Sequence, residues 1–260
     1  MSNCRVIALT NQKGGVGKST TVVNLGAYLG SRGKRVLCVD IDPQGNATSG
    51  LGINKRALEQ SAYDVMINSV PAKDVILESE YENVWVLPSN MALAGAELEL
   101  VDMDRRESRL KTALAPVKAD FDFIFFDCPP SLGLITLNAL CASDTVMVPI
   151  QCEYYALEGL SQLMSTVRQV KRLYNPMIEI EGVLLTMYDG RLNLTQQVVD
   201  EVKRFFPRKV YSSVIPRNVR LSEAPSFGQP VMYYDRSSKG TSAYNDFADE
   251  FLRMNGKKSN

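Results

Sequence analysis

The decapeptide NQKGGVGKST, residues 11–20, follows a short apolar run at residues 6–10 and opens a helical pattern at residues 20–29. A strand, a glycine-rich loop and a helix, in this order, form the setting in which proteins bind phosphate groups. Glycines let backbone N–H groups turn toward one point, and a helix that starts near Gly17 directs its free amides and its positive dipole end there. The stretch therefore predicts a P-loop rather than a plain glycine-rich turn.

The side chains of this loop predict how it would bind Mg-ATP. Lys18 can bridge the β- and γ-phosphates, the Ser19 hydroxyl is placed to bind Mg²⁺, and Thr20 can reach the α-phosphate. One position departs from the general pattern, which has glycine five residues before Gly17, whereas this chain has Gln12. The predicted nucleotide-binding residues of the loop are Lys13, Gly14, Gly15, Val16, Gly17, Lys18, Ser19 and Thr20.

A second lysine, Lys13, lies inside the same loop. Its tether is too short to curl readily back onto the γ-phosphate beside Lys18, but its side chain could reach a nucleotide held by a facing subunit. The loop resembles the deviant Walker A motif of the ParA/MinD group of ATPases, Lys-Gly-Gly-x-Gly-Lys-Ser/Thr. This resemblance implies a homodimer that forms with ATP, in which Lys13 crosses to the partner's nucleotide. We expect Lys13 and Lys18 to be the two lysines of the catalytic site.

Two carboxylates follow the second predicted strand, residues 35–40. Asp40 and Asp42 stand at positions i and i+2, so they share one side of an extended chain. At the carboxyl edge of a parallel sheet they would face the crevice where ligands bind. We expect Asp42 to orient the attacking water as a catalytic residue, and Asp40 to lie in the outer coordination shell of the metal. A solvated Asp-Pro-Gln-Gly turn is the structural alternative.

Residues 121–127, FDFIFFD, predict a buried strand that ends in Asp127. Such a strand delivers a carboxylate toward Mg²⁺, usually through a water molecule, as in Walker B motifs. A carboxylate at the end of so apolar a strand would be costly without a cation or hydrogen-bond donors. We therefore predict that Asp127 serves the metal together with Ser19 and Asp40, and the alternative is a strand-end cap.

Composition excludes several other kinds of site. The chain has 260 residues with 29 basic and 29 acidic side chains, so no overall charge attracts it to DNA or membranes. It has no histidine, which excludes Ser-His-Asp triads and histidine metal ligands. The five cysteines form no CxxC pair, which predicts reduced, buried thiols in the cytoplasm. Neither a signal peptide nor a stretch of about 20 apolar residues is visible, so we expect no membrane span.

Short apolar runs alternate with helical patterns, which predicts an α/β fold: a mostly parallel, twisted sheet with helices on both faces. Most of the runs are apolar on both sides, as buried parallel strands are. The predicted strands span residues 6–10, 35–40, 84–87, 121–127, 145–150, 180–186 and 209–215. The clearest helices span residues 20–29, 131–142, 157–173 and 194–206, with Ser131 as N-cap of the second. Residues 54–81 read as helical and irregular.

The pattern predicts one P-loop ATPase domain, residues 1–255, and a frayed tail at residues 256–260. Near the end, Phe247, Phe251 and Leu252 share one face of a helical pattern, and three acidic residues flank them. Anionic lipid would repel such a helix, so we predict that it docks on the fold.

Five motifs together resemble the ParA/Soj group of chromosome and plasmid partitioning ATPases, P-loop proteins with a deviant Walker A motif. They are residues 11–15 (NQKGG), 39–46 (VDIDPQGN), 127–131 (DCPPS), 151–159 (QCEYYALEG) and 215–226 (IPRNVRLSEAPS). These motifs run across nearly the whole chain, and Gln12 is itself typical of the group. The resemblance implies a cytoplasmic, nucleoid-associated ATPase of weak intrinsic activity that binds ATP or ADP with Mg²⁺.

The same resemblance implies roles for single residues. Pro216 and Asn218 would contact adenine, and Gly14 would lie at the dimer interface. Lys18 would be needed to bind ATP, and Asp42 to hydrolyse it. A centromere-binding partner similar to ParB or Spo0J would stimulate hydrolysis through a basic N-terminal segment. The N-terminal helix-turn-helix domain of larger plasmid relatives is not seen here, so DNA binding would have to use the ATPase body.

A basic stretch suggests a surface for non-specific double-stranded DNA. Residues 203–220 contain six basic side chains and no acidic one, and a dimer would double such a surface and make binding salt-sensitive. The six are Lys203, Arg204, Arg208, Lys209, Arg217 and Arg220. Arg191 and Arg220 match positions that the family uses for DNA. We predict contacts from Arg191, Arg217 and Arg220, and ordinary solvated side chains are the alternative for any one of them.

Three other functions stay open at this point. A membrane-associated ATPase of the MinD type would end in a basic amphipathic helix. An iron–sulfur reductase like the nitrogenase iron protein would need a cysteine pair at a dimer interface. A nucleotide-regulated adaptor would bind ATP and rarely hydrolyse it, although Asp42 and Asp127 favour hydrolysis.

Overall fold

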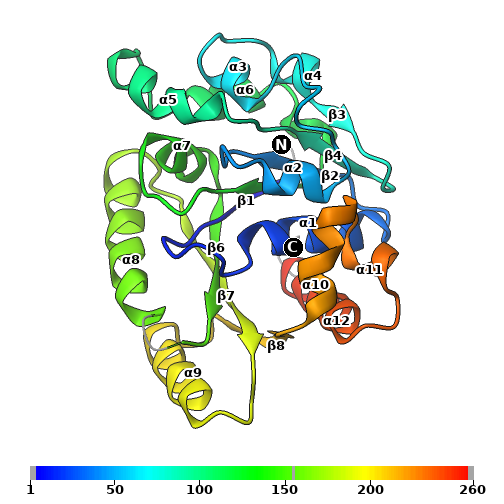
Figure 1. Cartoon of the computed structure of the whole chain (residues 1–260). Helices are drawn as coiled ribbons and strands as arrows, with labels where there is room; N and C mark the ends of the chain where they lie inside the picture. Colours follow the sequence, from blue (N-terminus) through cyan, green and yellow to red (C-terminus); the bar gives the residue numbers. More distant parts are fainter. Residues whose placement is uncertain (1–3, 154–155, 257–260) are drawn as a thin grey trace.

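A computed structural model describes residues 4–153 and 156–256, in which eight strands form one sheet, drawn in Figure 1. The strand order is β3-β4-β2-β5-β1-β6-β7-β8. Every neighbouring pair is parallel except β3 and β4, which are antiparallel. The strands are β1 Arg5–Leu9, β2 Val36–Asp40, β3 Leu77–Glu78, β4 Val84–Leu87, β5 Phe123–Asp127, β6 Thr145–Gln151, β7 Glu179–Tyr188 and β8 Val210–Pro216. The predicted α/β fold with a mostly parallel sheet is confirmed.

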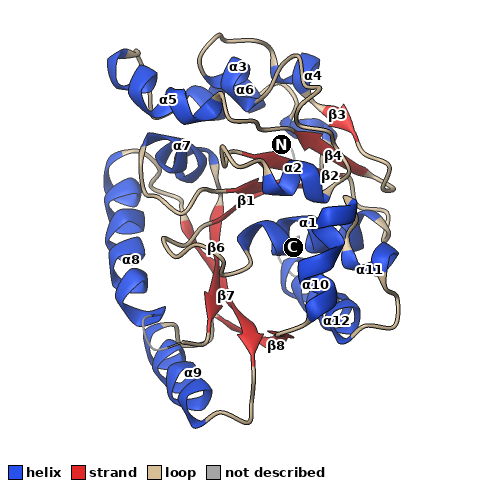
Figure 2. Cartoon of the chain, in the orientation of Figure 1, coloured by secondary structure: helices blue, strands red, loops and turns tan. Residues whose placement is uncertain are grey.

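Helices cover both faces of this sheet (Figure 2). They are α1 Lys18–Gly30, α2 Asn46–Gly50, α3 Ala62–Met66, α4 Ala72–Val75, α5 Leu93–Glu99, α6 Arg109–Leu114, α7 Leu134–Ala142, α8 Ala156–Leu173, α9 Asn193–Phe205, α10 Val219–Glu223, α11 Val231–Tyr234 and α12 Lys239–Gly256. Helices α1 and α12 pack on one face, and α7 and α8 pack on the other.

Two separate hydrophobic cores result from this layering, because successive side chains of a strand point to opposite faces. In β2, Leu37 and Val39 enter the core beneath α7 and α8, whereas Val36 and Cys38 enter the core beneath α1 and α12. All five residues of β2 and of β5 are buried. The uninterrupted apolar runs of the sequence are therefore explained by strands that are covered on both sides.

The start of α7 differs from the prediction. Ser131 is not its N-cap, because the helix begins at Leu134 and Gly133 occupies the cap position. The carboxylate of Glu97, from α5, accepts hydrogen bonds from the backbone N–H groups of Leu134 at 2.8 Å and Ile135 at 3.2 Å. A distant glutamate thus performs the capping that a local serine was expected to perform, and no local pattern signals it.

The structure also tests the predictions for residues 54–81 and for the C-terminal helix. Residues 54–81 contain the short helices α3 and α4, as expected, but also the two-residue strand β3, which was not predicted. The C-terminal helix α12 docks on the fold as predicted, with Tyr244, Phe247 and Phe251 fully buried. Of the predicted tail, Gly256 ends α12, and residues 257–260 lie outside the described residues. In the described ranges, no helix combines the length and the apolar character needed to span a bilayer.

Candidate nucleotide-binding site

The P-loop lies at the carboxyl end of β1, the strand between β5 and β6. It leads into α1, whose N-cap is Gly17 with φ 89° and ψ 24°. Gly15 has φ 72°, so both glycines adopt the left-handed backbone that larger residues disfavour. A methyl group added at Gly14 or Gly15 would meet no atom of the described residues within 4 Å, so space above the loop is open to a ligand.

Lys18 folds back across this loop. Its ammonium nitrogen donates to the backbone carbonyls of Asn11 at 3.1 Å and Lys13 at 3.3 Å, and its side chain is buried. Burial lowers the pKa of Lys18, and the nearby carboxylate of Asp127 works in the opposite direction. The loop therefore positions a desolvated cation at the point where phosphate oxygens would lie.

Asp127 is a buried carboxylate with unused hydrogen-bonding capacity. It ends β5 beside Asp40 in the sheet register, and neither of its oxygens has a hydrogen bond to a described residue. Burial, followed by the charge of Asp40, raises the pKa of Asp127 well above its usual range. The nearby Ser19 hydroxyl opposes that rise in the pKa. Such an isolated carboxylate is costly unless a cation compensates it.

These residues fit Mg²⁺, which binds oxygen ligands and retains several water molecules. The Ser19 hydroxyl and the unpaired oxygens of Asp127 supply oxygen at the foot of the P-loop. Within the ranges that the structure describes, no cluster of three or more acidic, cysteine or histidine side chains could hold a metal by itself. A metal bound chiefly through nucleotide phosphates and water matches that arrangement.

Asp40 is occupied by the protein itself. One carboxylate oxygen accepts hydrogen bonds from the backbone N–H and the hydroxyl of Thr48, at 2.8 and 2.7 Å, and the other accepts from the N–H of Asp42 at 3.1 Å. Burial raises the pKa of Asp40 to about 6. Asp40 therefore anchors α2 and the turn before it. The predicted position of Asp40 in the outer coordination shell of the metal stays a prediction.

Asp42 faces the open space, as predicted. One of its oxygens accepts the backbone N–H of Gln44 at 2.9 Å, which fixes the turn, and its side chain lines the cavity above the P-loop. The i and i+2 spacing was expected to turn both carboxylates toward the crevice, but only Asp42 lines the cavity. The chain turns after β2, so that Asp40 remains buried beneath the turn while Asp42 reaches the cavity.

The cavity above the P-loop has a volume of about 630 Å³, within the range of small-molecule sites. Its lining includes residues outside the motifs of the sequence analysis, among them Lys55, Met187 and Gln229. Met187 follows the buried part of β7 with φ 47°, an unusual conformation for a residue other than glycine. No motif identifies these three positions, because they come from separate segments: the loop after α2, the end of β7 and the residues before α11.

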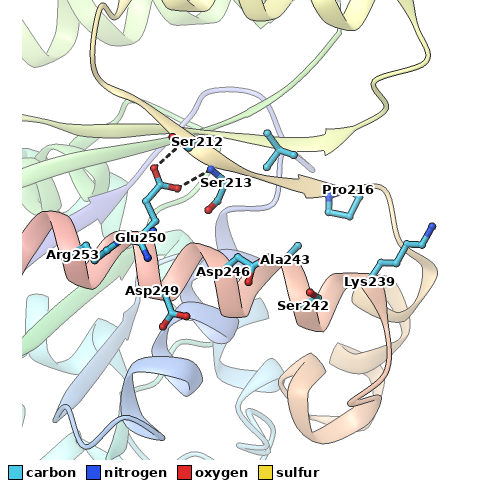
Figure 3. Close-up of a pocket in the computed structure, with 11 residues that line it drawn as sticks. Ser212, Ser213, Pro216, Lys239, Ser242, Ala243, Asp246, Asp249, Glu250 and Arg253 are labelled. Atoms are coloured by element: carbon cyan, nitrogen blue, oxygen red, sulfur yellow. Dashed lines mark hydrogen bonds between the residues drawn. The ribbon is translucent and has the colours of Figure 1, made fainter.

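Pro216 and Asn218 do not line this cavity. The Asn218 side chain accepts the backbone N–H of Arg220 at 2.9 Å and so caps α10. Pro216 lines a second groove of about 640 Å³ between β8 and α12, where Glu250 accepts the N–H groups of Ser212 and Ser213 (Figure 3). Their predicted contact with adenine remains a prediction that this arrangement does not support.

The predicted basic surface is divided in two. The strand β8 separates Lys203, Arg204, Arg208 and Lys209 from Arg217 and Arg220. Its seven residues span about 20 Å at about 3.3 Å per residue, so the two groups lie at opposite ends of the strand. The basic residues of the 203–220 segment are therefore close in sequence but do not form one patch on the surface.

The three arginines predicted to bind DNA are all partnered by acids. Arg191 is 88% exposed and pairs with Asp189 at 2.7 Å. The hydrogen bonds from Arg191, together with the charges of Arg191 and Arg217, lower the pKa of Asp189 to about 2. Arg220 pairs with Glu223 at 2.7 Å and with Asp235 at 3.1 Å. DNA phosphates would have to compete with these carboxylates.

Comparison with known proteins supports the family resemblance. Residues 4–180 match the family model of the AAA domain. The chain is 60% identical to the sporulation initiation inhibitor protein Soj of Bacillus subtilis strain 168, over 95% of this chain and 97% of that protein. It is 51% identical to the chromosome partitioning protein ParA of Myxococcus xanthus, over 98% of this chain and 90% of that protein.

A solved structure shares the fold over almost the whole length. The crystal structure of cobyrinic acid a,c-diamide synthase from Mycobacterium smegmatis, with bound ADP and magnesium, is 40% identical. It superposes with a TM-score of 0.86 and covers 99% of this chain and 97% of that chain. Together with the P-loop geometry, the near full-length identity to the two partitioning proteins shows that this chain is an ATPase of the Soj/ParA chromosome-partitioning family.

Proposed function

We propose that Mg-ATP joins two copies of this chain into a dimer that binds double-stranded DNA without sequence preference, and that hydrolysis releases the DNA. A partner similar to ParB or Spo0J would stimulate the hydrolysis. The observation that carries the proposal is the cavity above the P-loop, which Lys18, Ser19 and Asp42 line, with the unpaired carboxylate of Asp127 below it.

The P-loop would hold the triphosphate through the amide groups of residues 14–20, since the Lys13 N–H already donates to the Asn11 side chain. The ammonium group of Lys18, now bonded to two loop carbonyls, would turn to the β- and γ-phosphates. Ser19 would bind Mg²⁺ directly, and Asp127 would hold it through a water molecule. When bound, Mg²⁺ neutralises charge that develops on the phosphate oxygens.

Asp42 would orient the attacking water. Its carboxylate is anchored on one side by the Gln44 N–H, so the other oxygen is free to face a water molecule in the cavity. Phosphoryl transfer depends mainly on positioning and charge, which explains how a chain without histidine can perform it. Slow intrinsic turnover is expected, because the partner would be needed to complete the site.

Dimerisation would couple the nucleotide to DNA. Lys13 is half-buried and directly precedes Gly14, which lines the cavity, and its side chain could reach the nucleotide of a facing subunit. ATP would favour the dimer only because the dimer binds the γ-phosphate better than the monomer does. Pairing two chains doubles Arg191, Arg217 and Arg220, so phosphate contacts and salt dependence would both increase.

The test is retention of DNA by the protein with and without ATP, over a series of salt concentrations. Wild type should retain DNA only with Mg-ATP. Lys18→Ala should lose nucleotide binding and, with it, DNA retention, whereas Arg220→Glu should keep nucleotide binding and lose DNA. Equal retention by wild type with and without ATP would refute nucleotide control, and unchanged salt-dependent binding by Arg220→Glu would exclude that arginine.

A further inference from the structure

A threonine from β7, far from the P-loop in sequence, is bonded to the centre of that loop. The Thr186 hydroxyl donates to the backbone carbonyl of Val16 at 2.8 Å. Both side chains are almost completely buried, at 2% and 1% exposure. The Thr186 methyl carbon also lies 3.6 Å from the place where a side chain at Gly17 would begin. Thr186 therefore holds the peptide unit between Val16 and Gly17 from the β7 side.

The orientation of that peptide unit decides where the Gly17 amide points. In a planar trans peptide, the carbonyl and the following N–H point in opposite directions. Because Thr186 holds the Val16 carbonyl on the β7 side, the Gly17 N–H points away from β7. Within the described residues it donates to no protein acceptor, and Gly17 lines the cavity. The amide is thus available to a phosphate oxygen.

We propose that Thr186 is a positioning residue of the ATPase site, which aims the Gly17 N–H at the phosphates of the nucleotide. This inference rests on the proposed function, since it assumes that a triphosphate occupies the P-loop cavity. Thr186 does not touch the nucleotide itself. It acts through the loop backbone, where preorganised amides stabilise negative charge without a further cost of reorientation.

A second pair of hydrogen bonds, at the start of the loop, supports this role for Thr186. The Asn11 side chain donates to the carbonyl of Pro149 in β6 at 2.8 Å and accepts the backbone N–H of Lys13 at 3.0 Å. The neighbouring strands β6 and β7 therefore each hold one end of the P-loop. Asn11 fixes the entrance of the loop, and Thr186 fixes its exit into α1.

The experiment compares wild type, Thr186→Val, Thr186→Ser and Thr186→Ala. Valine keeps the shape without the hydroxyl, and serine keeps the hydroxyl without the methyl. Affinity for a non-hydrolysable ATP analogue with Mg²⁺ is measured by calorimetry, steady-state kcat and KM by phosphate release, and thermal unfolding without nucleotide. Thr186→Val should bind the analogue roughly tenfold more weakly, as loss of one aimed donor predicts, and Thr186→Ser should bind close to wild type.

The Thr186→Ser and Thr186→Ala variants differ only in the hydroxyl oxygen. If Thr186→Val fails to fold, comparing these two variants still tests whether the hydroxyl positions the loop. Weaker binding by alanine than by serine, at similar melting temperatures, would support the positioning role. Equal affinities of wild type, valine and alanine variants, with only the melting temperature lowered, would overturn it. If wild type itself failed to bind the analogue, the proposed function would fall, and the role of Thr186 with it.

Discussion

The ammonium nitrogen of Lys13 lies 2.6 Å from a carboxylate oxygen of Glu153 in the same chain. Glu153 also accepts a hydrogen bond from the Gln151 side chain and lies 3.9 Å from the Arg217 guanidinium. The lysine predicted to cross a dimer interface is therefore held within its own subunit. To reach a partner's nucleotide, Lys13 would first have to leave Glu153.

The Glu153 contact leads to a first prediction. Glu153→Gln should release Lys13 and lower the ATP concentration at which dimers form. Both side chains are partly exposed, at 35% and 47%, so the pair contributes at most about 1 kcal/mol per subunit. We expect a shift of about two- to tenfold, measured by analytical ultracentrifugation against ATP concentration. Glu201→Gln removes a surface ion pair elsewhere and should cause no shift. Weaker dimerisation of Glu153→Gln would contradict the idea.

Asp42 gives the second prediction. Asp42→Asn can still accept the Gln44 N–H, so the turn should survive while the negative charge is lost. Hydrolysis should fall by about a hundredfold or more, the usual range for a group that moves or orients a proton. ATP binding should persist, and the dimer should remain on DNA. Phosphate release and DNA retention measure the two effects, and rapid turnover by this variant would refute the assigned role.

The divided basic surface gives the third prediction. Arg191 and Arg204 are both highly exposed, at 88% and 76%, and each pairs with one carboxylate. They form a matched pair, because Arg191 belongs to the proposed DNA surface and Arg204 lies at the other end of α9. Arg191→Ala should weaken DNA binding and reduce the slope of log affinity against log salt by about two, because the dimer loses one phosphate contact in each subunit. Arg204→Ala should leave the slope unchanged. A smaller slope for Arg204→Ala, with no change for Arg191→Ala, would place the DNA-binding surface at the Arg204 end of α9.

The cysteines give the fourth prediction. All five lie in the described ranges and are buried. Burial raises the pKa of Cys4 to about 12 and those of Cys141 and Cys152 to about 11, and it raises those of Cys38 and Cys128 as well. Since the thiolate is the reactive form, the native protein at pH 8 should react slowly with a thiol reagent and rapidly once unfolded. A fast-reacting native cysteine would contradict this.

The docked helix α12 gives the fifth prediction. The Phe251 ring is fully buried, with centroid distances of 5.4 Å to Phe123 and 5.9 Å to Phe125. Phe251→Ala should lower the free energy of unfolding by about 3–5 kcal/mol, the usual cost of removing a buried phenylalanine. Leu252→Ala, at a half-buried neighbour, should cost clearly less. Urea unfolding measures both, and equal small losses would mean that α12 contributes little to the fold.

The amino-acid sequence alone determined the features that depend on neighbours along the chain. The P-loop, the helix after it and the buried strands could be predicted because glycine conformation, helix starts and apolar runs are local properties. Asp42 and Asp127 could be placed at the sheet edge for the same reason, since Asp42 lies two residues after the end of β2 and Asp127 ends β5.

Only the tertiary structure decided how distant residues use these elements. Asp40 accepts hydrogen bonds from Thr48, Glu97 caps α7, and Lys13 pairs with Glu153. Thr186 reaches Val16 across a separation of 170 residues. Each contact forms between segments that the fold brings together, and a carboxylate or hydroxyl binds whichever donor or acceptor the packing places beside it, which spacing along one chain does not specify.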